Sequence, residues 1–487
     1  MGISSELLEH RCGYINGRWI DSATGGRLSV ANPATAESLT EVALMGQDDV
    51  DAAIQAANNA LCLAQPHSLQ ARRAWLTAIA EALQANQDEI GRILCLEHGK
   101  PLKEAKGEVA YAKSFFDYFA GQIELLAPRT LEQNPSDCRW QVHYRPVGVA
   151  ALITPWNFPI AMIAKKLSAA LAAGCPVVIK PASETPLTMI ALFHLLDRLP
   201  ELPAGMVNLV LGKASMIGQR VCEHPDVAMI SFTGSTRVGQ QLIRDSANGM
   251  KKLALELGGN APFVVFEDAD LDQAAAQLTA NKFRGGGQTC VCANRILVQA
   301  TVADEFAGKL VDRISKLKVG NGLQDDTDIG PLINQDGFDK VRRHTADALK
   351  QGARLLAGPD PDALDEASLF YPPTLIDGVS KQMACFREET FGPLVAMLRF
   401  DDEAQALAMA NDTDAGLAAY FFTADDQRAA RFAAGLRFGH VGHNTATGPT
   451  AEAPFGGMKS SGIGREGGHE GLFEFTEAQT IPRPIAS

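Results

Sequence analysis

Short, continuous apolar runs separated by helical patterns recur along the chain, and their order predicts its fold class. Five of these runs are typical of strands buried on both faces: "GVAALITPW", "PVVIKPA", "VNLVLG", "AMISFTGS" and "APFVVF". The clearest amphipathic helices are predicted at Trp75, Ile79 and Leu83, and at Phe306, Leu310, Ile314 and Leu317, the second ending at "VGNG". Strands that alternate with helices in this way predict an α/β fold with a doubly wound, mostly parallel sheet.

The pattern also divides the chain into regions. Four strand–helix pairs occupy about 148–255, and a second group runs from Glu256 to about Arg437. A chain of 487 residues is too long for one hydrophobic core, so we expect two or three domains. The segment 124–147 and the last residues fit neither group. Within that segment "WQVHYRPVG" alternates like an antiparallel arm, which packs on its own subunit or pairs with another.

Composition limits the binding partners and the cellular compartment that we expect for this protein. The formal net charge of −13 argues against nucleic acid or an anionic membrane as the main partner. Nine dispersed cysteines without a CxxC pair indicate reduced thiols, and the first residues contain no apolar signal core. The longest nearly apolar run, 167–179, is about half a membrane span. The reduced thiols and the lack of a signal core lead us to expect a cytoplasmic protein. The histidines lack metal-ligand spacing, so we expect no metal site.

Two loops at predicted strand ends have residues suited to a nucleotide. In "SFTGSTRVG", Gly234 allows close backbone approach, and the following helix favours a phosphate at its N-terminus. The spacing departs from GxGxxG, so a plain tight turn is the alternative. Lys180 in "VVIKPASETP" ends a strand, where open α/β sheets bind ligands, although a solvated loop lysine has the same pattern.

Three further residues have the chemistry of a covalent catalyst. Glu256 lies among leucines and glycines in "LELGGN", where burial would raise its pKa into the range of a general base. Asn157 in "TPWNFP" offers an amide to an oxyanion. Cys290 follows "GGGQT", and three glycines are expected where backbone approaches a ligand closely, which makes this cysteine a candidate nucleophile. The alternatives are a structural ion pair, an Asx turn and an inert buried thiol, respectively.

Seven motifs in this order resemble the aldehyde dehydrogenase superfamily. They are "TPWNFP", "KPAS", "FTGSTRVG", "LELGGN", "GQTC", "EETFGP" and "PFGGMKSSGIGREGG". Within the superfamily, "KFRGGGQTCVCANR" is most similar to succinate-semialdehyde dehydrogenases. The resemblance implies a Rossmann-like cofactor domain (1–123 and 148–255), an α/β catalytic domain (256–437) and a β-hairpin oligomerisation arm (124–147 and 470–487), hence a homo-oligomer.

The resemblance also implies the role of each matching residue. Cys290 attacks the aldehyde to form a thiohemiacetal, Asn157 holds the oxyanion, and Glu256 activates the water that hydrolyses the thioester left by hydride transfer to NAD or NADP. The positions that match cofactor contacts are Thr154, Trp156, Lys180, Ser183, Gly234, Ser235, Glu389 and Phe391.

Departures from the family pattern affect the cofactor and the substrate. Ser183 stands where many NAD-preferring members have Glu, so repulsion of a 2′-phosphate is removed and we expect NADP to be accepted. Arg284 keeps one of two arginines that bind the substrate carboxylate in the semialdehyde group, but Lys165 replaces the other and Thr450 lies in an altered loop. We therefore expect a small anionic aldehyde: succinate semialdehyde, or alternatively glutarate semialdehyde, a 2-oxo-acid semialdehyde or sulfolactaldehyde.

Two questions stay open at the level of sequence. Cys292, two positions after Cys290, forms a redox switch in some relatives and is otherwise a small core residue. A CoA-acylating enzyme or a non-catalytic member of the superfamily would keep the fold. Glu256 argues against the first alternative, and the three intact candidate catalytic residues argue against the second.

Overall fold

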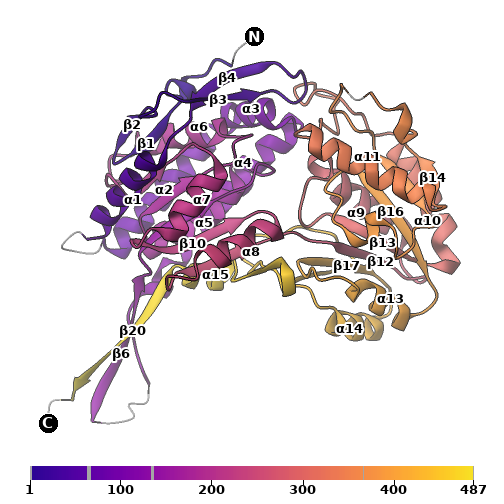
Figure 1. Cartoon of the computed structure of the whole chain (residues 1–487). Helices are drawn as coiled ribbons and strands as arrows, with labels where there is room; N and C mark the ends of the chain where they lie inside the picture. The colour runs from indigo at the N-terminus through magenta and orange to yellow at the C-terminus, as the bar shows by residue number, and fades with distance from the viewer. Residues whose placement is uncertain (1–2, 63–66, 133–136, 366, 486–487) are drawn as a thin grey trace.

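The computed structural model describes residues 3–62, 67–132, 137–365 and 367–485, which form two α/β lobes and a projecting arm (Figure 1). The first lobe is built on an eight-stranded sheet. Its strands in spatial order are β19 Gly462–Ile463, β11 Lys252–Glu256, β10 Val227–Thr233, β7 Val149–Ile153, β8 Val177–Lys180, β9 Val207–Leu209, β1 Gly13–Ile15 and β2 Arg18–Ile20. The strands β11, β10, β7, β8 and β9 are mutually parallel, and the last four correspond to apolar runs that predicted strands.

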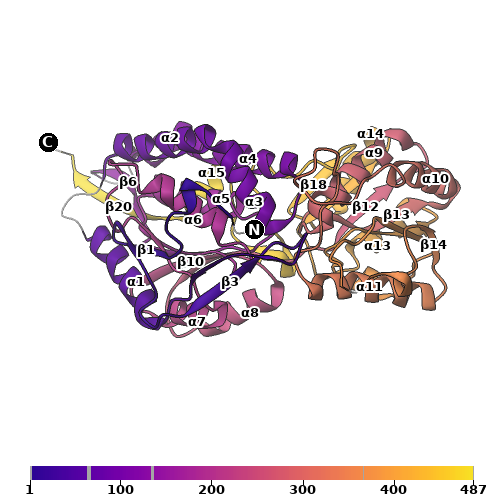
Figure 2. The same ribbon diagram turned by 90° about the horizontal axis from the view of Figure 1, so that it is seen from above.

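Helices cover both faces of this sheet (Figure 2). On one face lie α1 Gln47–Leu61, α7 Ala214–Glu223 and α8 Thr236–Asp245, and on the other α2 Leu69–Ala85, α3 Gln87–His98, α4 Leu102–Gln122, α5 Ala161–Ala173 and α6 Leu187–Leu196. The predicted helix around Trp75 is α2, which Ser68 caps by accepting a hydrogen bond from the Ala71 amide, and its apolar stripe is buried. A separate ribbon pairs β3 Arg27–Ala31 with β4 Ser38–Ala43.

The second lobe contains a seven-stranded sheet, parallel except for its first pair. The strand order is β14 Arg354–Ala357, β15 Thr374–Asp377, β16 Leu394–Phe400, β13 Ala293–Gln299, β12 Ala261–Val265, β17 Ala418–Phe422 and β18 His440–His443. Its helices are α9 Leu271–Phe283, α10 Ala303–Ile314, α11 Gln335–Lys350, α12 Ala384–Arg387, α13 Glu403–Asn411 and α14 Asp426–Gly435. Short 3₁₀ helices lie at η1 Glu6–Leu8, η2 Ile123–Leu126, η3 Arg284–Gly287, η4 Ala300–Val302, η5 Pro361–Ala363 and η6 Lys459–Ser461.

The helix expected to reach "VGNG" ends earlier than predicted. Helix α10 stops at Ile314, and Leu317 follows in a tight turn in which its amide donates to the Ile314 carbonyl. Leu317 still packs against the apolar core of this lobe. A 3₁₀ turn keeps the i, i+3 spacing of apolar residues, so the pattern alone extends the helix too far.

The arm combines two segments that are far apart in the chain. Strand β6 Cys138–Pro146, which contains most of the alternating "WQVHYRPVG", pairs antiparallel along its whole length with β20 Thr476–Pro484, and β5 Arg129–Thr130 pairs with its other edge. Helix α15 Gly468–Glu474 packs near α5 and leads into β20. The arm extends away from the first lobe with the C-terminal end of the chain near its tip (Figure 1).

Candidate active site

The residues singled out from the sequence gather where the two lobes meet. Lys180 ends β8 and Glu256 ends β11, while Thr154 and Gly234 follow β7 and β10. Because these strands are parallel and adjacent, their carboxyl ends lie at one edge of the first sheet. Cys290 comes from the other lobe, in the turn between η3 and β13. Both lobes therefore contribute to one site.

Lys180 and the residues after it form the first part of the candidate cofactor site. Burial lowers the pKa of Lys180 to about 8, and the charge of Glu184 opposes this shift. The amide of Thr154 donates to the Lys180 carbonyl at 3.1 Å, and the buried Thr154 hydroxyl oxygen has no partner. Ser183 is partly exposed. The expectation for the 2′-phosphate considered only position 183 as a source of repulsion. Glu184, one residue further along, is a second carboxylate close to Lys180.

A second part lies in a cleft of about 620 Å³ lined by Ser235, Gly258, Gly259 and Glu389. Ser235 caps α8 by accepting a hydrogen bond from the Val238 amide. The Glu389 carboxylate accepts a hydrogen bond from the Gly259 amide at 3.2 Å, and burial raises the pKa of Glu389 to about 7. The cleft thus offers a capped helix N-terminus and a partly buried carboxylate, which suit a phosphate and a ribose hydroxyl.

Gly234, Trp156 and Phe391 complete the set of expected cofactor positions. The Gly234 amide donates to the Glu256 carbonyl at 3.0 Å, so this loop is joined to the end of β11. Trp156 meets Phe391 edge to face with 5.6 Å between ring centroids. Phe391 has a φ of +59°, a left-handed conformation that a bulky residue rarely adopts. The buried unpartnered hydroxyl of Thr154 and the neighbouring cleft fit a dinucleotide at this edge.

Cys290 and Glu256 line one cavity, which we term the inner cavity, together with Lys165, Arg284, Tyr111 and Phe158. Burial raises the pKa of the Cys290 thiol to about 12, and the charge of Glu389 adds to the effect. Burial also raises the pKa of Glu256 well above its usual range, reinforced by Glu466, as the apolar setting in the sequence predicts. One carboxylate oxygen of Glu256 has no partner and is available to a water or a substrate.

The loop that carries Asn157 lies next to the turn before Cys290. The Asn157 amide nitrogen donates to the Gln288 carbonyl at 3.0 Å, two residues before Cys290, and its side-chain oxygen has no partner. An amide nitrogen has two hydrogens, so one remains for an oxyanion. The hydrogen bond of this side chain leads to the Cys290 turn rather than to a local Asx turn.

Lys165 and Arg284 both reach the inner cavity but in different surroundings. Lys165 is only 2% exposed. Its ammonium lies 3.8 Å from the Glu466 carboxylate and 4.9 Å from the centre of the Phe455 ring. Burial disfavours its charge, but Tyr111, Glu466 and other neighbours outweigh burial and raise the pKa of Lys165. Arg284 is exposed, and its guanidinium lies 4.8 Å from the centre of the Phe158 ring.

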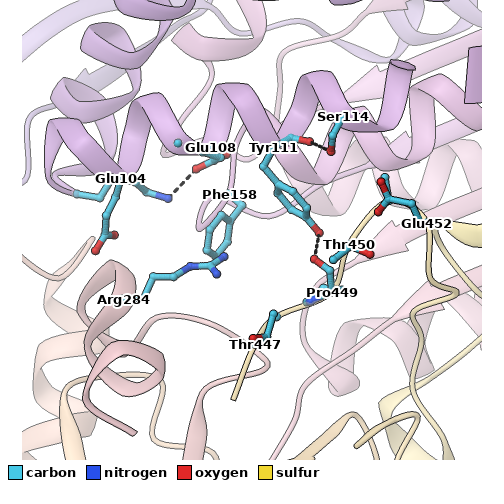
Figure 3. A pocket seen from close by; sticks show the side chains of 14 residues that line it. Glu104, Glu108, Tyr111, Ser114, Phe158, Arg284, Thr447, Pro449, Thr450 and Glu452 are labelled. Carbon is cyan, nitrogen blue, oxygen red and sulfur yellow. Dashed lines mark hydrogen bonds and ion pairs between the residues drawn. The ribbon is translucent and has the colours of Figure 1, made fainter. Parts of the chain in front are cut away.

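A wider outer pocket of about 610 Å³ adjoins the inner cavity, and its wall includes Thr450. Figure 3 shows Arg284 directed toward Phe158, with Thr450 and Glu452 on the far side of the pocket. Arg284, Tyr111, Phe158 and Pro449 border both spaces. The structure therefore places Arg284 between the outer pocket and Cys290, whereas Thr450 lines only the outer pocket.

The three glycines before Cys290 form a turn of left-handed backbone conformation. Gly285, Gly286 and Gly287 have φ values of +57°, +67° and +76°, which side chains other than glycine adopt rarely. A Cβ atom on Gly287 would come within 2.3 Å of the Gly392 carbonyl oxygen. The positive φ values favour glycine throughout the turn, and Gly287 also packs closely against the loop that contains Gly392.

Two other residues near Cys290 have clear surroundings. Cys292 is buried, and its thiol donates to the Asn281 carbonyl at 2.9 Å, so the thiol has a structural partner. Arg295 is fully buried, and its guanidinium donates to backbone carbonyls of Asn260, Met409 and Ala410. Arg295 therefore has a structural role.

Two residues of the site were missed at the level of sequence. Glu466 forms an ion pair with the buried Lys166 and lies beside Lys165. Its carboxylate therefore adds a negative charge to the wall of the inner cavity. It belongs to "GIGREGG", but nothing in that motif indicates its distant partners. Tyr111 lies on α4, and its hydroxyl donates to the Pro449 carbonyl at 2.9 Å (Figure 3). The buried stripe of α4 gives no signal that would separate this tyrosine from core residues.

Within residues 3–62, 67–132, 137–365 and 367–485, no group of three or more His, Cys, Asp or Glu side chains is arranged to hold a metal ion. No helix in these ranges is long and apolar enough to cross a bilayer.

Curated relatives match almost the full length of the chain. It is similar to a glutarate-semialdehyde dehydrogenase of Pseudomonas putida, 46% identical with 99% of each chain covered. It is also similar to the NADP(+) succinate-semialdehyde dehydrogenase GabD of Escherichia coli, 45% identical with 98% of each covered. A 3-sulfolactaldehyde dehydrogenase of Pseudomonas putida is 43% identical with 96% of each covered.

A solved structure and a family comparison agree with these relatives. An oxidoreductase from Marinobacter aquaeolei is 63% identical and superposes with a TM-score of 0.97, covering 99% of this chain and 100% of the other. Residues 19–481 match the description "Aldehyde dehydrogenase family". These findings confirm the predicted fold class and the resemblance. The chain belongs to the aldehyde dehydrogenase family and is an aldehyde-oxidising enzyme.

Proposed function

We propose that this enzyme oxidises a short aldehyde with an anionic group at its far end, by covalent catalysis at Cys290. As a member of its family it uses NAD or NADP. The observation that supports the proposal most directly is that Cys290 and Glu256 line one cavity, which Arg284 and Lys165 also reach. A nucleophile, a base and two cations in one enclosed space suit an anionic aldehyde better than a neutral one.

The proposed reaction assigns one step to each side chain. The Cys290 thiol releases its proton to solvent and attacks the aldehyde carbon, and the Asn157 amide holds the oxyanion that forms. When bound, the nicotinamide accepts the hydride that converts the thiohemiacetal to a thioester. The deprotonated Glu256 then takes a proton from water, whose oxygen attacks the thioester and releases the acid. Lys180, Ser235 and Glu389, with Thr154, Trp156, Ser183, Gly234 and Phe391, would hold the cofactor at the edge of the first sheet.

Arg284 is the principal anion ligand in this proposal. It borders both the inner cavity and the outer pocket and is exposed, whereas Lys165 is buried beside Glu466. Glu466 competes for the Lys165 charge, so we assign Lys165 a lesser share of anion binding than the sequence alone suggested. Thr450 would contact only the outer part of a longer substrate, since it lines only the outer pocket.

We expect Arg284→Met to raise the KM for a carboxylate-ended aldehyde about tenfold. A charge-assisted hydrogen bond contributes about 1.5–3 kcal/mol, and exposure of Arg284 reduces its share to the lower end. The KM for an uncharged aldehyde of equal length should stay within about twofold, measured by NADPH formation. A parallel loss on the uncharged aldehyde would show that Arg284 supports the loop and not the anion.

The substrate class is tested with a panel of aldehydes. Relatives of this chain are named for glutarate semialdehyde, succinate semialdehyde and 3-sulfolactaldehyde, so the panel should include carboxylate-, sulfonate- and neutral-ended aldehydes. It should also include 2-oxo-acid semialdehydes and be run with both cofactors. A lysine is a point charge that tolerates the tetrahedral sulfonate as well as the planar carboxylate, so Lys165 leaves the sulfonate as a second candidate. Equal kcat/KM for the neutral aldehydes would contradict the proposed anionic class.

Cofactor choice depends on the residues after Lys180. We expect the wild type to use NADP, and Ser183→Glu to lower kcat/KM for NADP about tenfold while leaving NAD within about threefold, because like charges repel in a partly exposed site. Ser183→Gln adds similar bulk without charge and should keep the NADP activity. If Glu184 already repels the 2′-phosphate, the wild type will prefer NAD and Ser183→Glu will change little, and the argument for NADP is then lost.

The arm and the cysteines support two further parts of the proposal. We infer that the enzyme assembles from identical subunits through the arm, because a three-stranded sheet outside the lobes leaves strand edges for a second copy. We also infer a cytoplasmic location, since all nine cysteines are free thiols. Redox switching at Cys292 would require its thiol to leave the Asn281 carbonyl, and peroxide inactivation that Cys292→Ala prevents would support it.

A further inference from the structure

A buried ion pair lies beside the loop that carries Asn157 and lines the outer pocket. Lys100 follows α3, Glu108 lies on α4, and both side chains are only 1% exposed. The Lys100 ammonium donates to the Glu108 carboxylate at 2.7 Å, and the dashed line at Glu108 in Figure 3 marks this contact. Removing two charges from water is costly, so a buried pair is weak evidence of a contribution to stability. Its remaining contacts indicate another role.

The other contacts of both charges converge on the segment 157–161. The Lys100 ammonium donates to the Asn157 backbone carbonyl at 2.7 Å and lies 4.1 Å from the centre of the Phe158 ring. The free oxygen of the Glu108 carboxylate accepts hydrogen bonds from the Ile160 amide at 3.0 Å and the Ala161 amide at 3.2 Å. One charge therefore binds the start of this segment and the other binds its end, where α5 begins.

Charge-assisted hydrogen bonds of this kind are short and strong, and inside a protein they are hardly screened. The Lys100 ammonium binds the backbone carbonyl of Asn157, while the side-chain amide of Asn157 donates to the Gln288 carbonyl. An oxyanion donor must keep its position to a fraction of an ångström to favour the transition state. Hydrogen bonds to the backbone of that donor satisfy this requirement.

We propose that Lys100 and Glu108 are positioning residues that hold the 157–161 backbone so that the Asn157 amide stays aimed at the oxyanion. The proposal rests on the oxyanion role proposed above for Asn157. It assigns a catalytic consequence to an ion pair whose observed contacts are with the backbone of this segment and the Phe158 ring.

The test is a double-mutant cycle on the rate constant of the acylation burst, followed by stopped-flow NADPH formation. Asn157→Ala should slow the burst about 10²–10³-fold, the usual effect of losing one oxyanion donor. Lys100→Met should slow it about 10–100-fold, the effect of misplacing such a donor, with the KM for aldehyde within about threefold. In the Asn157→Ala background, Lys100→Met should slow the burst less than about twofold further, because the donor it positions is absent.

Two variants separate positioning from folding. Lys100→Met leaves a buried carboxylate without its partner, whereas Lys100→Met/Glu108→Gln is neutral and should recover most of the lost Tm while its burst stays slow. Lys103→Met, on α4 three residues after Lys100, removes an exposed lysine paired with Asp328 and should leave the burst unchanged. A burst that recovers together with the Tm in the double variant would overturn the proposal.

The remaining outcomes distinguish this proposal from the one on which it rests. If Lys100→Met and Asn157→Ala slow the burst in a multiplicative way, Lys100 acts independently of Asn157 and the positioning role fails alone. If Asn157→Ala leaves the burst unchanged, the oxyanion role of Asn157 fails, and the positioning role fails with it.

Discussion

Replacing Cys290 by alanine is expected to reduce kcat/KM for aldehyde oxidation by about 10⁴-fold or more, because the nucleophile that forms the covalent bond is lost. NADPH formation measures the loss, and cofactor affinity should stay within about twofold in a fluorescence titration. The inner cavity offers no obvious substitute, since the neighbouring Cys292 thiol is buried and donates to the Asn281 carbonyl.

Cys292→Ala is the matched control for this experiment. The two cysteines are separated by one residue, so a general disturbance of the turn would affect both variants. We expect Cys292→Ala to retain activity within about threefold. Activity that survives in Cys290→Ala would rule out the covalent mechanism proposed for this enzyme, and activity lost equally in both variants would point to misfolding of the turn.

Glu256→Gln is expected to separate the two halves of the reaction. The thioester should still form, so a burst of NADPH approaching one equivalent per subunit should persist. Turnover after the burst should fall about 10²–10⁴-fold, the usual contribution of a general base. Rapid mixing followed by mass measurement of the acylated subunit provides the check. Loss of the burst together with turnover would assign Glu256 to the first half instead.

The same residue predicts the direction of the pH dependence. Burial and the Glu466 charge raise the pKa of Glu256 well above that of an ordinary glutamate, so the carboxylate that accepts the proton forms at a higher pH than usual. As pH rises through this raised pKa, the carboxylate forms and the steady-state rate should increase. Glu256→Gln should lose this increase. A wild-type rate that falls over the same pH range would contradict the role of Glu256 as a base.

Much of the fold follows from residues that are read locally. The apolar runs that became β7, β8, β9, β10 and β12 are short, bounded by turns and buried on both faces, so their strand character needs no knowledge of distant contacts. The raised pKa of Glu256 was likewise foreseen from its apolar neighbours. Loops at strand ends could be assigned to one edge because parallel strands bring them together.

What could not be predicted depends on partners far away in the chain. The sequence shows Lys165 as an unpaired cation, but Glu466, about 300 residues later, lies 3.8 Å from its ammonium and changes its charge environment. The glycines at 285–287 suggested space for a ligand, whereas Gly287 is required by the close approach of the Gly392 carbonyl. Tyr111 has the periodicity of a core residue, and only the fold brings its hydroxyl to Pro449.

The late position of β19 and Glu466 in the chain affects how the enzyme is made. Strand β19 forms the edge of the first sheet beside β11, and Glu466 is the carboxylate that pairs with the buried Lys166. While the ribosome is still translating the second lobe, the first lobe therefore has an open sheet edge and two buried lysines without their counter-charge. Domains usually fold in order from the N-terminus during synthesis, but this lobe can be completed only after the last segment leaves the exit tunnel. The inner cavity acquires its full charge only when the segment that contains Glu466 folds onto the first lobe, so we expect aldehyde turnover to begin only after that segment has emerged.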